Sequence, residues 1–264
     1  MSQIIPAKDR ILTIRDLFLR NRDQIQAALP RHMTVDRMIR VAFTSINTTP
    51  KLLDCTPRSL LGAVIQSAQL GLEPGILGHV YLVPFENKRA GTVEVQIIPG
   101  YKGLIKLARN TREVSTVFAQ PVYSGDAFAY QYGTDPKIHH VPDDKLPDRG
   151  VPTHYYAVMR LKDGGAIFDV MRHGDIERHR DRYSRAAKQG PWLTEFDEMA
   201  KKTVLRRICK TGPQSIELQT AVALDERAEI QLPQELPDIL GEAPGASAGP
   251  VTLEDLAKQG RETA

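Results

Sequence analysis

The sequence predicts an α+β fold, in which an antiparallel sheet of β-hairpins packs against several helices in a single domain with a flexible C-terminal tail. Two observations predict it. Short β-rich runs follow one another between residues 78 and 173 with turn residues between them, which favours pairing of neighbouring strands. Strand and helix do not alternate along the chain, as they would in a doubly wound parallel sheet. With 264 residues, 41% of them hydrophobic, the chain can bury one substantial core or two small ones.

Two helices are expected before residue 50, because apolar side chains recur at helical spacing over residues 10–29 and 34–47. A third helix follows Thr56, whose hydroxyl can cap its first turn. It ends at Gly71, because glycine readily adopts the left-handed conformation that stops a helix.

Six strands and four further helices are expected after Gly71. The strands are β-branched and aromatic runs, namely residues 78–85, 92–99, 114–123, 127–132, 154–162 and 166–173. The first two join through ENKRAG and the last two through DGG, and both connections suit hairpin turns. One helix follows the turn at Pro99–Gly100. The chain then closes with helices near residues 174–184, 194–211 and 214–228.

The end of the chain differs in composition from the rest. Residues 231–250 contain four prolines and three glycines, too many breakers for a packed helix or strand. We therefore expect a folded, functional domain over residues 1–228 and a flexible acidic tail over residues 229–264. Within the tail, VTLEDLAKQG is expected to be a short amphipathic helix or a docking peptide for another protein.

The net charge of +3 hides an asymmetry between the body and the tail. From Asp225 onward the chain holds nine acidic and three basic residues, a net charge of −6. The preceding 224 residues therefore hold 32 basic and 23 acidic residues, a net charge of +9. A basic body with an acidic tail indicates a polyanionic partner for the body.

Three further features indicate a cytoplasmic protein without a membrane anchor. No run of 18 or more apolar residues is present, and the N-terminus becomes charged too early for a signal peptide. The two cysteines, Cys55 and Cys209, have neither CxxC spacing nor the regular pattern of a disulfide framework. We expect them to be small buried hydrophobic residues in a reducing compartment.

The segment MAKKTVLRRICK, residues 199–210, carries five positive charges and no acidic residue. With about 100° per residue, a helix places its apolar residues on one arc and four of its cations on the opposite side. These four are Lys202, Arg206, Arg207 and Lys210. Lys201 instead points into the apolar arc, where it can extend past its neighbours or into a groove. A solvated helix face usually mixes both signs of charge, so this face favours contact with a polyanion.

A second basic helix is the one expected after Pro99–Gly100. Lys102, Lys106 and Arg109 are spaced i, i+4 and i+7, so they share one face, while Tyr101 lies on the other. The amides at the start of this helix could also hold a phosphate. Two helices of this kind could line one groove that binds a nucleic acid.

Five sequence blocks of the chain, taken in their order, resemble those of a known protein family. They are GLEPGILGHVYLVPF, VQIIPGYKGLIKLAR, AQPVYSGDAFAYQYG, YYAVMRLKDGG and GPWLTEFDEMAKKTVLRRICK. Together they resemble the RecT family of phage-type single-strand DNA annealing proteins, over roughly residues 40–228. The chain departs from the family pattern at TGPQS, residues 211–215, where a leucine or a similar residue is expected beside the proline.

The resemblance implies ATP-independent binding of single-stranded DNA and annealing of complementary strands into duplex DNA. It also implies assembly into a homo-oligomer, either a ring or a helical filament, and a phage or prophage origin within a bacterial host cell. For some members it implies a companion phage exonuclease and a contact with the host single-strand binding protein.

An annealing protein has to hold phosphates while the Watson–Crick edges stay free for a second strand, and cationic helices can do so without reading sequence. The residues expected to contact DNA are Lys102, Lys106, Arg109, Lys201, Lys202, Arg206, Arg207, Lys210 and Tyr101. For Tyr101, core packing is an open alternative. No GxxxxGK[ST] motif is present, and GLEPGILG indicates a helix end and a turn, so no nucleotide cofactor is expected.

Two other functions stay open. A metal-dependent nuclease needs carboxylates that converge on cations. Two segments hold suitable residues, first Asp135, His139, His140, Asp143 and Asp144, and then Asp169, His173, Asp175, Glu177, His179 and Asp181. Neither has a known metal-binding spacing, so we expect a solvated turn in the first, a helix start in the second, and no catalytic residue or metal ion. The other alternative is a nucleic-acid coating protein that does not anneal.

Overall fold

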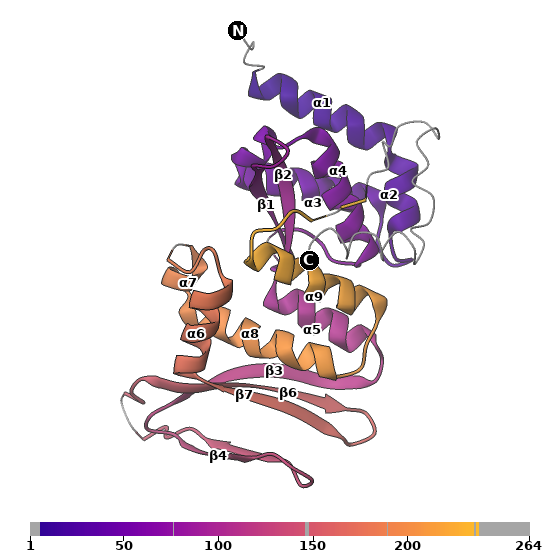
Figure 1. Ribbon diagram of the computed structural model, residues 1–264. Helices are drawn as coiled ribbons and strands as arrows, with labels where there is room; N and C mark the ends of the chain where they lie inside the picture. Colours follow the sequence, from indigo (N-terminus) through magenta and orange to yellow (C-terminus); the bar gives the residue numbers. More distant parts are fainter. Residues whose placement is uncertain (1–5, 76, 146–147, 189, 235, 238–264) are drawn as a thin grey trace, which may run out of the picture.

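The computed structural model describes residues 6–75, 77–145, 148–188, 190–234 and 236–237, and Figure 1 shows two halves stacked along its long axis. The first half contains α1 (Ala7–Arg20), α2 (Arg22–Ala28), α3 (Val35–Thr48), the 3-10 helix η1 (Pro50–Asp54), α4 (Pro57–Gln69), β1 (Val80–Asn87) and β2 (Thr92–Pro99). The second half contains α5 (Tyr101–Asn110), β3 (Val114–Tyr123), β4 (Ala127–Gln131), β5 (Lys137–Val141), β6 (Pro152–Leu161), β7 (Ala166–Arg172), α6 (His173–Tyr183), α7 (Pro191–Thr194), α8 (Phe196–Thr211) and α9 (Ile216–Glu229). Every strand pair is antiparallel in the described residues, which confirms the predicted fold class.

Helix α4 begins and ends as expected. The Thr56 hydroxyl accepts a hydrogen bond from the Ser59 amide at 3.3 Å, and Gly71 follows the helix with a φ of 64°. The helix expected over residues 10–29 is instead two helices, α1 and α2, because Asn21 leaves the helical conformation between them. Its side-chain amide donates to a backbone carbonyl one turn back at 2.8 Å, a local bond that competes with the continuing helix.

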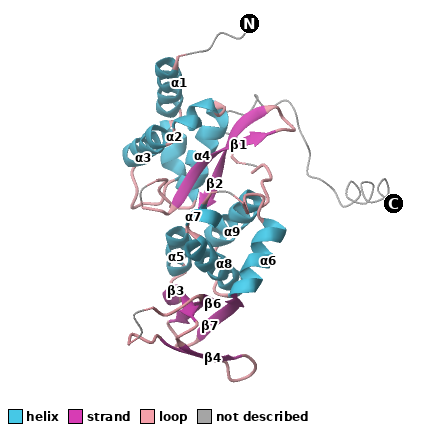
Figure 2. Ribbon diagram, turned by 90° about the vertical axis from the view of Figure 1, so that its left-hand side faces the viewer, coloured by secondary structure: helices cyan, strands magenta, loops and turns pink. Residues whose placement is uncertain are grey.

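The second half is built on a three-stranded sheet with the strand order β3–β6–β7. On the central strand, Ala157 lies between Ala119 of β3 and Asp169 of β7. Helix α8 lies along one face of this sheet and α5 lies beside it, while α9 packs on both helices and reaches β2 of the first half (Figures 1 and 2). Buried apolar residues form one continuous cluster through both halves, so the halves share a core.

The expectation of a solvated turn at residues 135–144 is wrong. This segment contains β5, which pairs with β4 in a hairpin on the other face of the sheet. Side chains of β5 alternate between exposed and half-buried, and the inward His140 places its Nε2 3.0 Å from Asp126 Oδ2. A five-residue strand between two prolines has only two inward positions, so its alternation is too short to distinguish from a loop.

The free edge of β2 is closed by three separate contacts. Residues at the start of α4 bond to the Val93 carbonyl at 2.9 Å and to the Val95 amide at 3.1 Å. At Ile97 the side chain of Gln234 supplies both partners. Its Oε1 accepts from the Ile97 amide at 2.6 Å, and its Nε2 donates to the Ile97 carbonyl at 2.8 Å.

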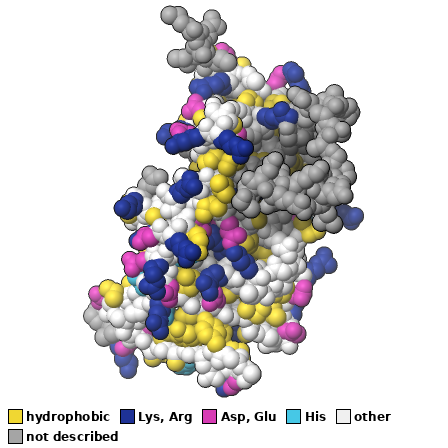
Figure 3. Space-filling view, viewed as in Figure 1, with side chains coloured by type: hydrophobic (Ala, Val, Ile, Leu, Met, Phe, Trp, Pro, Cys, Tyr) yellow, Lys and Arg dark blue, Asp and Glu magenta, His cyan; other side chains and the backbone are white. Residues whose placement is uncertain are grey.

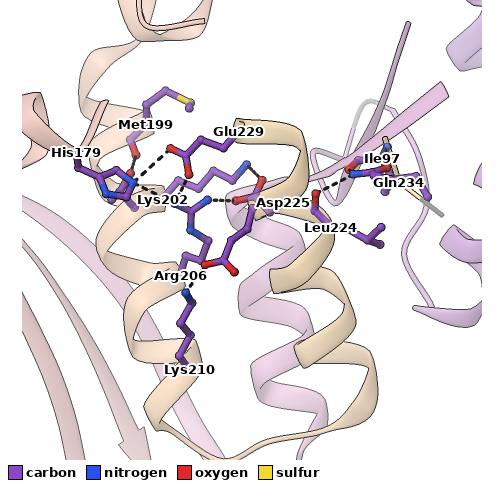
Figure 4. A network of polar contacts seen from close by, with 12 residues as sticks. Ile97, His179, Met199, Lys202, Arg206, Lys210, Leu224, Asp225, Glu229 and Gln234 are labelled. Carbon is purple, nitrogen blue, oxygen red and sulfur yellow. Dashed lines mark hydrogen bonds and ion pairs between the residues drawn. The ribbon is translucent and has the colours of Figure 1, made fainter. Parts of the chain in front are cut away.

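Gln234 also joins the two halves of the molecule. It is 7% exposed, and its Nε2 donates to the Leu224 carbonyl of α9 at 2.8 Å (Figure 4). These contacts add residues beyond 228 to the folded body. The boundary of the functional domain near residue 228 stays a prediction, and VTLEDLAKQG lies outside the described residues.

The start of α5 lies very close to the turn before β1. A Cβ atom on Gly103 would lie 2.0 Å from the His79 carbonyl oxygen, and one on Gly100 would lie 2.2 Å from that of Gly78. Only glycine, which has no Cβ, allows the two backbones to approach in this way. The two contacts therefore fix where the basic face of α5 begins.

We expect Gly103→Ala to destabilise the protein, although alanine is the better helix former. Helix propensity alone would stabilise it by about 1 kcal/mol, but the added methyl group has to displace backbone, and overpacking costs about 1–3 kcal/mol or more. Urea unfolding followed by circular dichroism measures the change. Gly174→Ala in α6 is the control, because its Cβ would meet only the Arg178 side chain, at 3.6 Å. Equal stability of the two variants would show that the packing at Gly103 is not tight.

Candidate nucleic-acid interface

All five cations of the MAKKTVLRRICK segment in α8 have carboxylate partners. The ion pairs are Lys201–Glu198, Lys202–Asp225, Arg206–Asp225, Arg206–Glu229, Arg207–Asp169 and Lys210–Glu226. Three of these five carboxylates belong to α9, which covers the side of α8 that the sequence predicts to be open and cationic (Figure 4). On the surface, Figure 3 shows cations and acids intermixed over the middle of the molecule. The face of α8 is therefore largely neutralised.

Arg206 lies inside the protein, so the prediction that it occupies an exposed polar face is wrong. Its side chain is 8% exposed, and its guanidinium contacts Asp225 Oδ2 at 2.8 Å and Glu229 Oε2 at 2.5 Å. His179 Nε2 lies 3.2 Å from Arg206 and 3.3 Å from Glu229. Burial acts to raise the pKa of Glu229, but the hydrogen bond from His179 and the charge of Arg206 outweigh it and lower the pKa to about 2. Glu229 is therefore ionised at neutral pH.

The other cations on this side of α8 differ in how far they reach solvent. Lys202 is nearly as buried as Arg206, and its ammonium donates to Asp225 at 2.5 Å. Arg207 and Lys210 are 53% and 48% exposed. Their charged groups can therefore contact an anion outside the protein, whereas those of the two buried residues cannot do so in this conformation.

Tyr101 packs at the contact between α5 and α8. Its hydroxyl accepts a hydrogen bond from the Ala119 amide at 3.3 Å, and its ring packs against the core. The Lys201 ammonium lies 6.0 Å from the centre of the ring, which is a cation–π distance. Of the two alternatives for Tyr101, core packing is the one that this geometry favours.

The three cations of α5 line one shallow, open depression on the surface, so they share a face as the sequence predicts. Lys102 and Arg109 are exposed and have no carboxylate partner among the residues that the structure describes. Lys106 is different, because its Nζ donates to the Gly71 carbonyl at 2.8 Å and burial lowers its pKa. Of the eight cations expected to contact DNA, Lys102 and Arg109 are the ones that are exposed and have no carboxylate partner among the described residues.

A charged cluster that the sequence did not indicate fixes α5 to the first half. Arg37 on α3 makes two hydrogen bonds with Glu73, at 2.5 and 2.9 Å, and this pairing lowers the pKa of the buried Glu73 carboxyl. The nearby positive charge of Lys106 lowers it further. In the sequence, GLEPGILG indicates only a helix end and a turn, so the role of its glutamate depends on contacts that the sequence does not contain.

The carboxylates of the second candidate nuclease segment pair with cations instead of converging. The pairs are Asp169–Arg207, Asp175–Arg178 and Asp181–Arg180. Within the described ranges, no three metal-ligating side chains come together. Helix α6 begins at His173, which confirms the expected helix start in this segment.

The fold and this surface are those of an α+β protein with two exposed cations on one helix that are unpaired among the described residues, a surface typical of proteins that bind polyanions. In the described part of the chain, no helix combines the length and the apolar composition needed to cross a membrane. The chain belongs to the RecT family, whose family model matches residues 36–237. The resemblance seen in the sequence is thereby confirmed.

Two relatives show how far the similarity extends. The chain is 47% identical to Protein RecT of Escherichia coli (strain K12) over 214 residues, which cover 80% of this chain and 78% of that protein. It is 26% identical to the Uncharacterized protein YqaK of Bacillus subtilis (strain 168) over 200 residues, 75% of this chain and 64% of that protein. Membership of the RecT family supports a role in DNA recombination, with binding and annealing of single-stranded DNA.

Proposed function

We propose that this protein binds single-stranded DNA without ATP and anneals complementary strands as a homo-oligomer. The observation that carries the proposal is the pair of free cations on α5, in a chain that belongs to the RecT family. Lys102 and Arg109 lie on one exposed helix face, so they can contact phosphates without reading the base sequence. The Watson–Crick edges then stay available to a second strand.

The residues expected to contact DNA divide into two groups by exposure. The four with exposed charged groups are proposed to contact phosphates, and they are Lys102, Arg109, Arg207 and Lys210. In the last two, a phosphate would take the place of a carboxylate partner. The others are paired or more buried and are proposed to hold the fold beneath the DNA, and they are Tyr101, Lys106, Lys201, Lys202 and Arg206.

The partners and setting that follow from the family resemblance remain part of this proposal. They are annealed duplex DNA, a ring or helical filament of identical subunits, a phage exonuclease and the host single-strand binding protein, in the cytoplasm of a bacterial host cell. The acidic tail is proposed to contact one of these proteins rather than DNA, because its net negative charge repels phosphates. No catalytic step and no cofactor are part of the mechanism.

Binding to single strands should depend strongly on salt and hardly at all on sequence. If the four exposed cations each neutralise one phosphate, the logarithm of the binding constant should fall against the logarithm of the salt concentration with a slope of about −3. Titration of labelled oligonucleotides of different sequence measures both properties. Added complementary strand should then yield duplex without nucleotide and in the presence of EDTA.

Three results would contradict the proposal. A slope near zero would exclude phosphate contacts as the main source of affinity. Binding without any acceleration of annealing would favour the coating protein. Shortened strands on a denaturing gel with magnesium or manganese, absent when Asp169 and Asp175 are replaced by alanine, would favour the nuclease.

A further inference from the structure

Tyr81 lies at the junction between the β1–β2 hairpin and the start of α5. It is the second residue of β1 and pairs with Ile98, two residues before Gly100. Its ring lies across the backbone of two glycines. A Cβ atom on Gly78 would lie 3.1 Å from the Tyr81 hydroxyl, and one on Gly100 would lie 3.1 Å from ring carbon Cε2.

The side chain of Lys102 reaches the same place. Its Cδ would lie 3.8 Å from the Cβ on Gly78, so the tyrosine and the lysine converge on one glycine. Lys102 is one of the two free cations of α5, and Arg109 follows it by two turns on the same face. An aromatic ring and a positive charge therefore lie together at one end of the surface proposed to hold DNA.

Tyr81 is also exposed without a partner of its own. Its exposed fraction is 49%, and among the described residues it has no hydrogen bond and no contact with another ring. Two other exposed tyrosines differ in this respect. The Tyr132 hydroxyl accepts from the Val170 amide at 3.0 Å, and the Tyr183 ring lies 4.9 Å from that of His179. The solvent-facing side of the Tyr81 ring is thus open to a flat ligand.

We propose that Tyr81 stacks on a base of the single strand whose phosphate Lys102 holds. This inference rests on the proposed function and adds a base contact to it. Stacking uses the face of a base and not its edge, so one ring per protomer orders the strand while its Watson–Crick edges stay free. It is also tolerant of sequence, because every base has an aromatic face.

The test compares two ligands, an oligothymidylate and an abasic oligomer of the same length. Tyr81→Ala should weaken binding of the oligothymidylate by about 5- to 150-fold, the range for loss of one base–aromatic stack. It should leave binding of the abasic oligomer and the salt slope unchanged, because no phosphate contact is lost. Tyr81→Phe should bind both ligands like the unsubstituted protein, since the ring remains.

Tyr183→Ala is the matched control, because it removes an exposed tyrosine on α6, away from α5 (Figure 1). It should change the affinity for neither the oligothymidylate nor the abasic oligomer. If Tyr81→Ala weakens binding of both oligomers equally, Tyr81 only orders the start of α5 and the proposal is overturned. The proposal is also overturned if Tyr81→Ala binds both oligomers as tightly as the unsubstituted protein does. Failure of the unsubstituted protein to bind either oligomer would instead refute the proposed function.

Discussion

Arg206→Ala is expected to lower the free energy of unfolding by about 3–5 kcal/mol. The substitution removes the guanidinium that Asp225 and Glu229 share, and leaves Lys202 beside Asp225 and His179 beside Glu229. Breaking a buried ion pair leaves uncompensated charge away from water, and this costs far more than breaking an exposed pair. Urea unfolding followed by far-ultraviolet circular dichroism measures the change.

Arg207→Ala is the matched control, because it removes the same side chain from the next position, where the side chain is 53% exposed. Loss of its pair with Asp169 should cost less than about 1 kcal/mol. Acid unfolding provides a second readout. The folded pKa of Glu229 is about 2 against 4.5 for an unperturbed glutamate, so its contribution is complete above pH 4.5 and is lost as the pH falls towards 2. Equal stability of both variants would return Arg206 to the candidate DNA contacts.

Lys102→Glu combined with Arg109→Glu is expected to weaken binding of single-stranded DNA by about 100-fold at 0.1 M salt, with the fold intact. Each lost phosphate contact should make the salt slope less steep by about 0.7, and the two new carboxylates repel the strand in addition. Both side chains are exposed and without a described carboxylate partner, so their replacement should change stability by less than about 0.5 kcal/mol.

The control variant has the same change of net charge, placed on a part of the surface outside α5. Arg160→Glu combined with Lys162→Glu places the same four-unit change at exposed positions where β6 ends and the turn to β7 begins. If DNA binding depends on local contacts with α5, the control should weaken it by only a few-fold through long-range repulsion. Equal losses in the two variants would show that net charge alone attracts the strand and that α5 is not the contact surface.

Elements with strong local signals were predictable from the sequence. The hairpin of β1 and β2 and the capped helix α4 depend on neighbouring residues, and each has its start and end marked by turn or cap residues. Strand β5 was not predictable, because two prolines flank a run too short to show its alternation. Nor was the break at Asn21, because apolar spacing continues across it from α1 into α2.

The charged residues of the site were likewise only partly predictable from local sequence. A helical projection of α8 gives the direction of its cations but not what packs on them, so the projection predicted an open face where α9 lies. The signal that could have revealed the contact is a matched spacing. Lys202 and Arg206 are four residues apart, as are Asp225 and Glu229 in the helix that follows after a short turn. Two consecutive helices with opposite charges at the same interval can pair along one seam.

The closure of the β2 edge by Gln234 constrains how the protein can fold while it is being synthesised. Ile97 and Gln234 are 137 residues apart, which corresponds to roughly 7 to 27 s of translation. The other edge contacts of β2 come from α4, which leaves the ribosome earlier, so they can form as soon as the strand appears. The amide and carbonyl of Ile97 stay without their partner until Gln234 has been synthesised. During that time the open strand edge can pair with a neighbouring nascent chain. Ile97 is therefore the position of the β2 edge at which two chains on one polysome can pair for the longest time. That period ends when Gln234 leaves the ribosome and bonds to Ile97.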